Sequence, residues 1–352
     1  MKKINKIKEI DEKKSLLVFG DNLEGLKKII PIYEGKIDLI YIDPPYNTQQ
    51  TFTVSKERSS TISREKKGTV AYSDCYSLDE YLKFLEKRLK LLYRLLSENG
   101  SIYLHIDYKI GHYVKILMDK IFGIQNFKND ITRIKSNPKN FNRKAWSNEK
   151  DMILFYSKNA SLNIWNYVKQ PLTENEMLRR FNKKDEKGYY TTVPLHAPGE
   201  TSNGDTGKSW KGIYPPLGRH WRVSPEKLDE LDEMGLIEWS KTGNPRLKKY
   251  AEDHKGKVYQ DVWCFKDPQY PTYPTEKNEE MLELIIKQSS NLDSIVMDCF
   301  CGSGVTLKTA NSLGRRFIGI DCSKLAIEVT ERALQGVDFQ YLNMSKSISN
   351  LT

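Results

Sequence analysis

A short run near the N-terminus, Asp43-Pro44-Pro45-Tyr46, carries groups that suit the recognition of an amino group. Two consecutive prolines fix the backbone and leave carbonyl oxygens without local N–H partners. The Asp43 carboxylate and the Pro44 carbonyl can therefore each accept one hydrogen from an exocyclic –NH2 group. The ring of Tyr46 offers a face for a flipped-out planar base, and such stacking contributes about 1–3 kcal/mol. The run predicts a site for an aromatic amine, with a plain proline-rich turn as the structural alternative.

The chemistry of an aromatic amine explains why two acceptors are needed. Such an amine is a weak nucleophile because its lone pair is delocalised into the ring. Acceptors on both hydrogens favour a pyramidal nitrogen whose lone pair points at an electrophilic methyl group, so positioning governs the reaction. On this interpretation Asp43 orients the amine and need not remove its proton before transfer.

A second run, Phe300-Cys301-Gly302-Ser303-Gly304, lies between an expected strand and an expected helix. Glycines there let the backbone approach a ligand at the carboxyl end of the strand. Asp298 precedes the run, and Asp321 ends the next expected strand, where an acid can accept hydrogen bonds from ribose hydroxyls. Leu307 stands where a dinucleotide fingerprint needs a third glycine or alanine, and no P-loop lysine follows. A tight turn of small residues is the alternative, and we expect no metal site.

Both runs follow apolar segments that alternate with helical patterns, which predicts an α/β fold with a doubly wound, mostly parallel sheet. Strands are expected at 16–19, 38–42, 101–106, 129–135, 151–156, 294–298 and 316–320. Helices are expected from 23 to a stop at Pro31, behind a capping box of Ser77 and Glu80, and at 110–121, 279–287, 305–313 and after Ser323. A long polar loop is expected over 48–76.

The sequence pattern changes between 158 and 271, where turn residues, tryptophans and basic residues replace the regular alternation of strand and helix patterns. This stretch predicts an inserted module, with a catalytic domain split into 1–157 and 272–352. Of the 352 residues, 38% are hydrophobic and 29% charged, which is typical of a globular protein. The formal net charge of +10 favours a polyanionic partner. We find neither an apolar membrane span nor a signal core, and five scattered cysteines suggest reduced thiols in the cytoplasm.

With both runs in view, the chain resembles the DNA amino-methyltransferases that use S-adenosylmethionine, in the circularly permuted beta order with the amine motif first. The resemblance covers about 15–157 and 272–336, and it implies a seven-stranded sheet with a target-recognition region at 158–271. Tyr273-Pro274-Thr275-Glu276-Lys277 resembles a segment that flanks the cofactor, although Asn278 replaces its final proline. Catalytic roles are implied for Asp43, Pro44, Pro45 and Tyr46. Cofactor contacts are implied for Asp21, Asp43, Lys277, Asp298, Phe300, Cys301, Gly302, Ser303, Gly304, Thr306 and Asp321.

Double-stranded DNA is the expected substrate, with adenine N6 as the target because Asp43 resembles the adenine-specific members. Cytosine N4 and an RNA target stay open as alternatives, as does a DNA-binding protein without catalysis. The resemblance to modification enzymes of restriction systems allows a homodimer and a separate restriction endonuclease as partners. His105 and Asp107 end an expected strand and receive no catalytic role. Expected DNA contacts are Asn47, Lys56, Arg58, Arg64, Lys66, Lys67, Arg143, Lys144, Lys211, Arg219 and Arg222.

Overall fold

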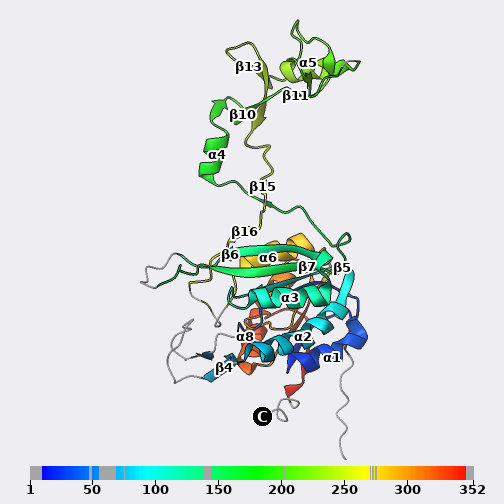
Figure 1. The fold of residues 1–352 in the computed structure, drawn as a ribbon, viewed down its shortest axis with the longest axis vertical. Helices are drawn as coiled ribbons and strands as arrows, with labels where there is room; N and C mark the ends of the chain where they lie inside the picture. The colour runs from blue at the N-terminus through cyan, green and yellow to red at the C-terminus, as the bar shows by residue number, and fades with distance from the viewer. Residues whose placement is uncertain are drawn as a thin grey trace, which may run out of the picture. The chain divides into compact units, whose positions relative to one another are not determined.

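The structure, a computed structural model, consists of two compact units, residues 1–168 with 260–352, and residues 169–259 (Figure 1). It describes residues 10–46, 50–54, 69–74, 76–137, 144–201, 203–269, 271, 273 and 276–345. Within those residues, no helix combines the length and the apolar character needed to cross a membrane.

A large sheet forms the centre of the first unit. Its nine strands among the described residues follow the order β16-β6-β7-β5-β2-β17-β18-β1-β19. Every neighbouring pair is parallel except those of β7, which runs antiparallel to β5 and β6. The sheet is therefore mostly parallel as predicted, but it has two strands more than the seven expected, because β16 and β19 extend its edges. The strands are β1 (Ser15–Phe19), β2 (Ile37–Ile42), β5 (Leu96–Ile106), β6 (Phe127–Ile134), β7 (Lys150–Ser157), β16 (Val262–Cys264), β17 (Ile295–Asp298), β18 (Arg316–Asp321) and β19 (Phe339–Asn343).

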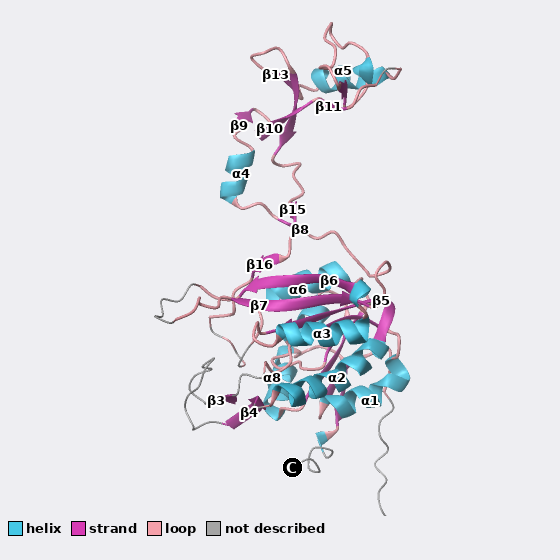
Figure 2. Cartoon of the chain, viewed as in Figure 1, coloured by secondary structure: helices cyan, strands magenta, loops and turns pink. Residues whose placement is uncertain are grey.

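Helices cover both faces of this sheet. On one face α1 (Asn22–Tyr33) packs against α2 (Leu78–Leu95), and α2 packs against α3 (Gly111–Phe122) (Figure 2). A second layer joins α6 (Glu279–Ser289) to α7 (Val305–Ser312) and α7 to α8 (Lys324–Ala333). The crossovers β2-α2-β5 and β17-α7-β18 lead in opposite directions along the sheet, so right-handed connections place their helices on opposite faces. The doubly wound α/β prediction is confirmed.

Local signals set the ends of the helices. The predicted capping box is present at α2, where the Ser77 hydroxyl accepts from the Glu80 N–H and the Glu80 carboxylate accepts from the Ser77 N–H. The leucine stripe behind it fills the core at Leu85, Leu89 and Leu92. The expected stop at Pro31 is wrong by two residues, because α1 continues to Tyr33, whose ring is buried in the core.

The Asp43 run and the glycine run follow neighbouring strands at the centre of the sheet. β2 and β17 are neighbours, with Met297 opposite Ile40, and the chain leaves them in opposite directions. A crevice at the carboxyl ends of such strands is the usual ligand site of an open α/β sheet. β1 and β2 follow each other in the sequence, yet β17 and β18 lie between them in the sheet.

The segment expected to be a polar loop over 48–76 contains regular structure. β3 (Gln50–Val54) pairs antiparallel with β4 (Thr69–Asp74), with a bulge between Phe52 and Thr53. The loop prediction missed this hairpin because polar residues interrupt both strands, so no apolar run marks them.

The second unit is shorter at both ends than the module expected at 158–271. Its sheet has the order β13-β14-β10-β9, and its core gathers Leu195, Trp210, Trp221, Leu228 and Ile237. Residues 262–264, which the prediction placed in the insert, form β16 and pair with β6 of the first unit. The elements of this unit are β8 (Lys169–Gln170), α4 (Glu174–Arg180), β9 (Lys183–Asp185), β10 (Gly188–Pro194), β11 (His196–Pro198), β12 (Arg219–Trp221), α5 (Pro225–Glu233), β13 (Ile237–Trp239), β14 (Pro245–Tyr250) and β15 (Lys257–Val258).

Candidate active site

Asp43, directly after β2, is held by two side chains. Its Oδ1 accepts a hydrogen bond of 2.6 Å from the Tyr46 hydroxyl, and its Oδ2 lies 2.7 Å from the Lys277 Nζ. Lys277 comes from the segment before α6, and its side chain is 9% exposed. Its ammonium group also lies 5.2 Å from the centre of the Tyr46 ring. Lys277, for which the family resemblance implied a cofactor contact, is thus bonded to the expected amine site.

A buried polar chain lies behind Tyr46. The ring of His105 is 6.1 Å from the Tyr46 ring, and its Nδ1 is 2.9 Å from the Tyr41 hydroxyl. The other ring nitrogen is 3.3 Å from Asp151, a β7 carboxylate that also binds the ammonium group of Lys135. Burial lowers the pKa of His105, so the ring is neutral at pH 7, accepts from Tyr41 and donates to Asp151. His105 thus supports Tyr46 and Tyr41 from inside the protein, and it is fully buried.

The glycine run makes the turn between β17 and α7. Gly302 and Gly304 have φ angles of +49° and +76°, a region that favours glycine. A Cβ on Gly304 would stand 2.6 Å from the Thr330 Oγ1 of α8, so close packing also requires glycine there. Asp321, at the end of β18, accepts from the Gly302 N–H at 2.9 Å and from the Ser323 N–H at 2.8 Å. These bonds fix the Asp321 carboxylate against the turn.

Asp298 supports the turn from inside the protein. Its two oxygens accept from the Phe300 N–H at 2.9 Å and from the Thr306 hydroxyl at 2.8 Å. The residue is only 3% exposed, and burial raises the pKa of Asp298 to about 7. Cys301, Ser303 and Thr306 are buried around it. Both Asp298 oxygens are thus engaged in holding the turn that displays Gly302.

Asp21 follows β1 at the same edge of the sheet. It caps α1 by accepting from the Glu24 N–H, and its second oxygen is 3.2 Å from an NH2 group of Arg88. Arg88 is buried, and it also donates to the Asn22 side chain, which in turn donates to the Cys299 carbonyl at 2.8 Å. Sequence analysis missed Arg88 because it lies in the leucine stripe of α2, where nothing local marks a buried cation.

Several expected DNA contacts lie outside the described residues: Asn47, Lys56, Arg58, Arg64, Lys66, Lys67 and Arg143. So do Pro274 and Thr275 of the segment that resembled a cofactor contact. Lys144 is exposed in the first unit, whereas Lys211 forms an ion pair with Asp232 inside the second.

Three arginines gather around His196 in the second unit. Arg219 lies 3.2 Å from the His196 Nδ1, and Arg222 donates to the Pro194 carbonyl. Arg246 donates to Thr192 on the neighbouring strand. Burial and the charges of these three arginines lower the pKa of His196. Each guanidinium has five N–H donors, so most of them stay available to an anion such as a phosphate.

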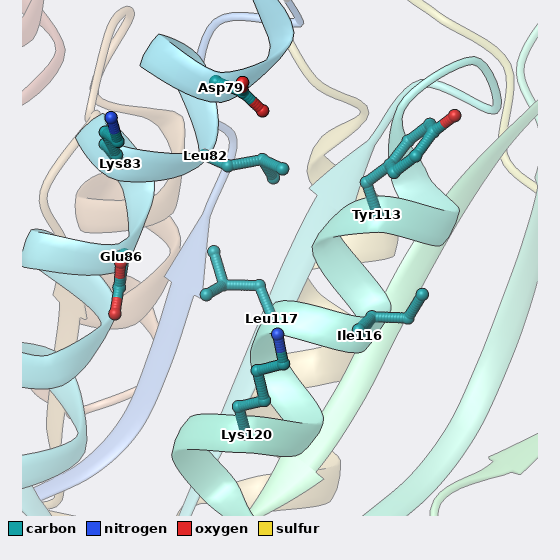
Figure 3. A pocket seen from close by; sticks show the side chains of 8 residues that line it. All are labelled: Asp79, Leu82, Lys83, Glu86, Tyr113, Ile116, Leu117 and Lys120. Atoms are coloured by element: carbon teal, nitrogen blue, oxygen red, sulfur yellow. The ribbon is translucent and has the colours of Figure 1, made fainter.

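A separate hollow lies between α2 and α3 (Figure 3). Leu82, Ile116 and Leu117 line it, with the charged groups of Lys83 and Lys120 at its sides. None of the strand-end residues described above borders it, so it does not belong to the candidate active site.

The sequence of the chain matches a known protein family and several curated proteins. The DNA methylase family (N6_N4_Mtase) matches residues 37–332, from β2 into α8. The Type II methyltransferase M.EcaI of Enterobacter cloacae is 44% identical over 317 residues, which cover 88% of this chain and 67% of that protein. The Type III EcoP15I Mod subunit of Escherichia coli is 26% identical, over 89% of this chain and 58% of the subunit. The chain thus spans little more than half the length of that Mod subunit.

A solved structure shares the fold. PvuII DNA methyltransferase, described as cytosine-N4-specific, superposes with a TM-score of 0.51 at 12% identity, covering 96% of this chain and 99% of that one. At this identity the likeness concerns the fold alone. The family match spans both the Asp43 run and the glycine run, and the M.EcaI alignment covers most of the chain, so this chain belongs to the DNA methylase family.

Proposed function

We propose that this chain is a sequence-specific DNA methyltransferase that modifies the N6 amino group of a flipped-out adenine, with S-adenosylmethionine as methyl donor. The observation that carries the proposal is that the Asp43 run and the glycine turn follow the neighbouring strands β2 and β17, from which the chain leaves in opposite directions. Membership of the family and the kinship with restriction-modification methyltransferases support it. An aspartate at position 43 favours adenine over cytosine.

The residues at the ends of β17 and β18 fit the proposed cofactor. Gly302 has no side chain and a positive φ, which leaves its backbone open to close approach. Each oxygen of Asp321 accepts one backbone N–H and keeps a further lone pair for a ribose hydroxyl. Asp21, held by Arg88, offers an acceptor for the amino group of the cofactor's adenine. Bound there, S-adenosylmethionine supplies an electrophilic methyl group on a positively charged sulfur.

The protein groups at β2 orient the target amine. Asp43 and the Pro44 carbonyl accept the two N6 hydrogens, which directs the nitrogen lone pair out of the ring plane. Tyr46 stacks on the base, and burial raises the pKa of its hydroxyl, so the group stays protonated and keeps its bond to Asp43. Transfer would break the bond between the methyl carbon and the sulfur, release neutral S-adenosylhomocysteine and form the new C–N bond. Asp43 would then stabilise the positive charge on N6 until one proton leaves to water.

The test is methyl transfer to unmethylated genomic DNA, with the products digested to nucleosides and identified by mass. Wild-type protein is compared with Asp43→Ala. We expect N6-methyladenine from the wild type only. N4-methylcytosine would keep the mechanism and overturn the base, and methylated RNA without methylated DNA would overturn the substrate.

We further propose that the second unit selects the DNA sequence and that its arginine cluster contacts phosphates. Each lost phosphate contact should reduce the slope of log affinity against log salt by about 0.9. Arg219→Ala, Arg222→Ala and Arg246→Ala should therefore each weaken binding to a random duplex and flatten its salt dependence. Lys227→Ala is the matched control, because Lys227 is exposed in the same unit and already pairs with Glu230. Salt slopes identical to the wild type would remove the cluster from the DNA interface.

We propose that the protein acts in the cytoplasm, where we expect its DNA substrate. The homodimer and the separate restriction endonuclease stay predictions, and light scattering of the purified protein measures the first.

A further inference from the structure

The partners of Asp43 in the structure conflict with its proposed role. Its Oδ2 forms an ion pair with Lys277, and its Oδ1 accepts from Tyr46. The Lys277 ammonium group also lies 5.2 Å from the ring on which the target base would stack. The lysine thus neutralises the carboxylate that has to receive an amino group.

A fixed lysine at this position would oppose the reaction. The sulfonium of the cofactor and the charge that develops on N6 are both positive, and like charges repel strongly in a site screened from water. A buried ammonium also needs an anionic partner, because an unpaired buried charge is strongly unfavourable. Lys277 must therefore leave Asp43 for another anion before transfer.

Three other acids at the described strand ends already support the fold. Asp298 holds the glycine turn, Asp321 accepts two backbone N–H groups, and Asp21 pairs with Arg88. The anion that arrives with the proposed cofactor is its own α-carboxylate. Tyr273, four positions before Lys277, lies beside the glycine turn, since a Cβ on Gly302 would meet its ring at 3.5 Å. The described residues Tyr273 and Lys277 thus reach the cofactor turn and the amine site, respectively.

We infer that Lys277 exchanges ion-pair partners: it pairs with Asp43 before the cofactor binds and then pairs with the carboxylate of the bound cofactor. This inference rests on the proposed function and adds an order of events. Cofactor binding frees Asp43, and only then can the target base enter productively. Lys277 is thus a positioning residue that links the two halves of the site.

The exchange can be tested by the affinity for S-adenosylhomocysteine. The sulfur of this ligand is neutral, so no sulfonium charge acts on Asp43 or Lys277. Asp43→Asn removes the partner that Lys277 must leave, so this variant should bind S-adenosylhomocysteine about fivefold or more tightly than the wild type, as expected for coupled charges in contact. In a Lys277→Met background the same Asn substitution should bring no gain. Lys287→Met is the matched control, because that lysine is exposed at the far end of α6 and pairs with Glu283.

A decarboxylated S-adenosylhomocysteine completes the test and does not depend on a Lys277 variant that folds. Titration calorimetry of wild type and Asp43→Asn with both ligands should show the gain for S-adenosylhomocysteine and none for the analogue without a carboxylate. An equal effect of Asp43→Asn on both ligands, or weaker binding by that variant, would overturn the exchange. Binding of neither ligand by the wild type would overturn the proposed cofactor instead.

Discussion

Replacing Asp298 with Asn should change how the stability of the protein depends on pH. The carboxyl group is buried and has its pKa raised to about 7, with burial as the main cause. The folded state therefore holds a proton that the unfolded chain has lost above its ordinary pKa of 3.8. Asn keeps the same shape, accepts from the Phe300 N–H and never ionises.

The size of the effect follows from the two pKa values. A raised pKa contributes stability that is complete below the unfolded value and is lost as pH rises to the folded value. The difference of about three pKa units corresponds to about 4 kcal/mol at 1.36 kcal/mol per unit. The wild type should thus lose about 1.4 kcal/mol per pH unit relative to Asp298→Asn between pH 4 and 7, and the difference should level off above pH 7.

Urea unfolding of both proteins at several values between pH 5 and 9 measures this difference. Thr306→Val is an informative companion, because the Thr306 hydroxyl donates to Asp298 and lowers the pKa of that carboxyl. Without that bond the pKa should rise further, so the loss of stability should continue to higher pH. A stability difference between Asp298→Asn and wild type that stays constant with pH would refute the reasoning.

Further substitutions test the supports of the site and of the fold. Gly304→Ala should lower the free energy of unfolding by about 3 kcal/mol in urea titrations, because it combines backbone strain with a Thr330 clash. Gly35→Ala, with a similar φ and open space, should cost only about 1 kcal/mol, and equal losses would contradict the clash. Ser77→Ala should cost about 1 kcal/mol in the same assay through loss of the α2 cap, whereas an unchanged midpoint would deny the cap any contribution. Arg88→Met should weaken S-adenosylhomocysteine binding about tenfold in calorimetry while preserving turnover at saturating cofactor; undiminished affinity would dismiss Arg88 as a support of the cofactor site.

The central strands could be predicted because they are continuous apolar runs, as expected where both faces of a parallel sheet are covered. The edge strands gave weaker signals: β16 has three residues, and β19 is partly exposed along its length. The second unit was harder still, because its strands have two to seven residues and its core packs Trp210 against Trp221 from separate segments. Short strands carry too few residues for a period to emerge.

The two site runs could be predicted because each is contiguous and keeps its chemistry within a few residues. Their supports could not, since they are contacts between remote segments. Asp21 and Arg88 are 67 positions apart, and His105 and Asp151 are 46 apart. Lys277 was expected near the cofactor, but its bond to Asp43 depends on the fold, which packs α6, directly after Lys277, against β2. Spacing along the chain does not encode such proximity.

The position of β17 and β18 between β1 and β2 has a consequence for biosynthesis. A ribosome delivers β1 and β2 early, but their places in the sheet are three strand spacings apart, about 14 Å. The middle of the sheet can fill only after β18 has been translated, roughly 15 to 60 s later at 5–20 residues per second. Until then two inner strands expose edges that in other chains invite aggregation. We therefore expect a nascent chain of this protein to expose these edges during most of its synthesis, and an N-terminal fragment lacks β17, the neighbour of the strand that carries the amine site.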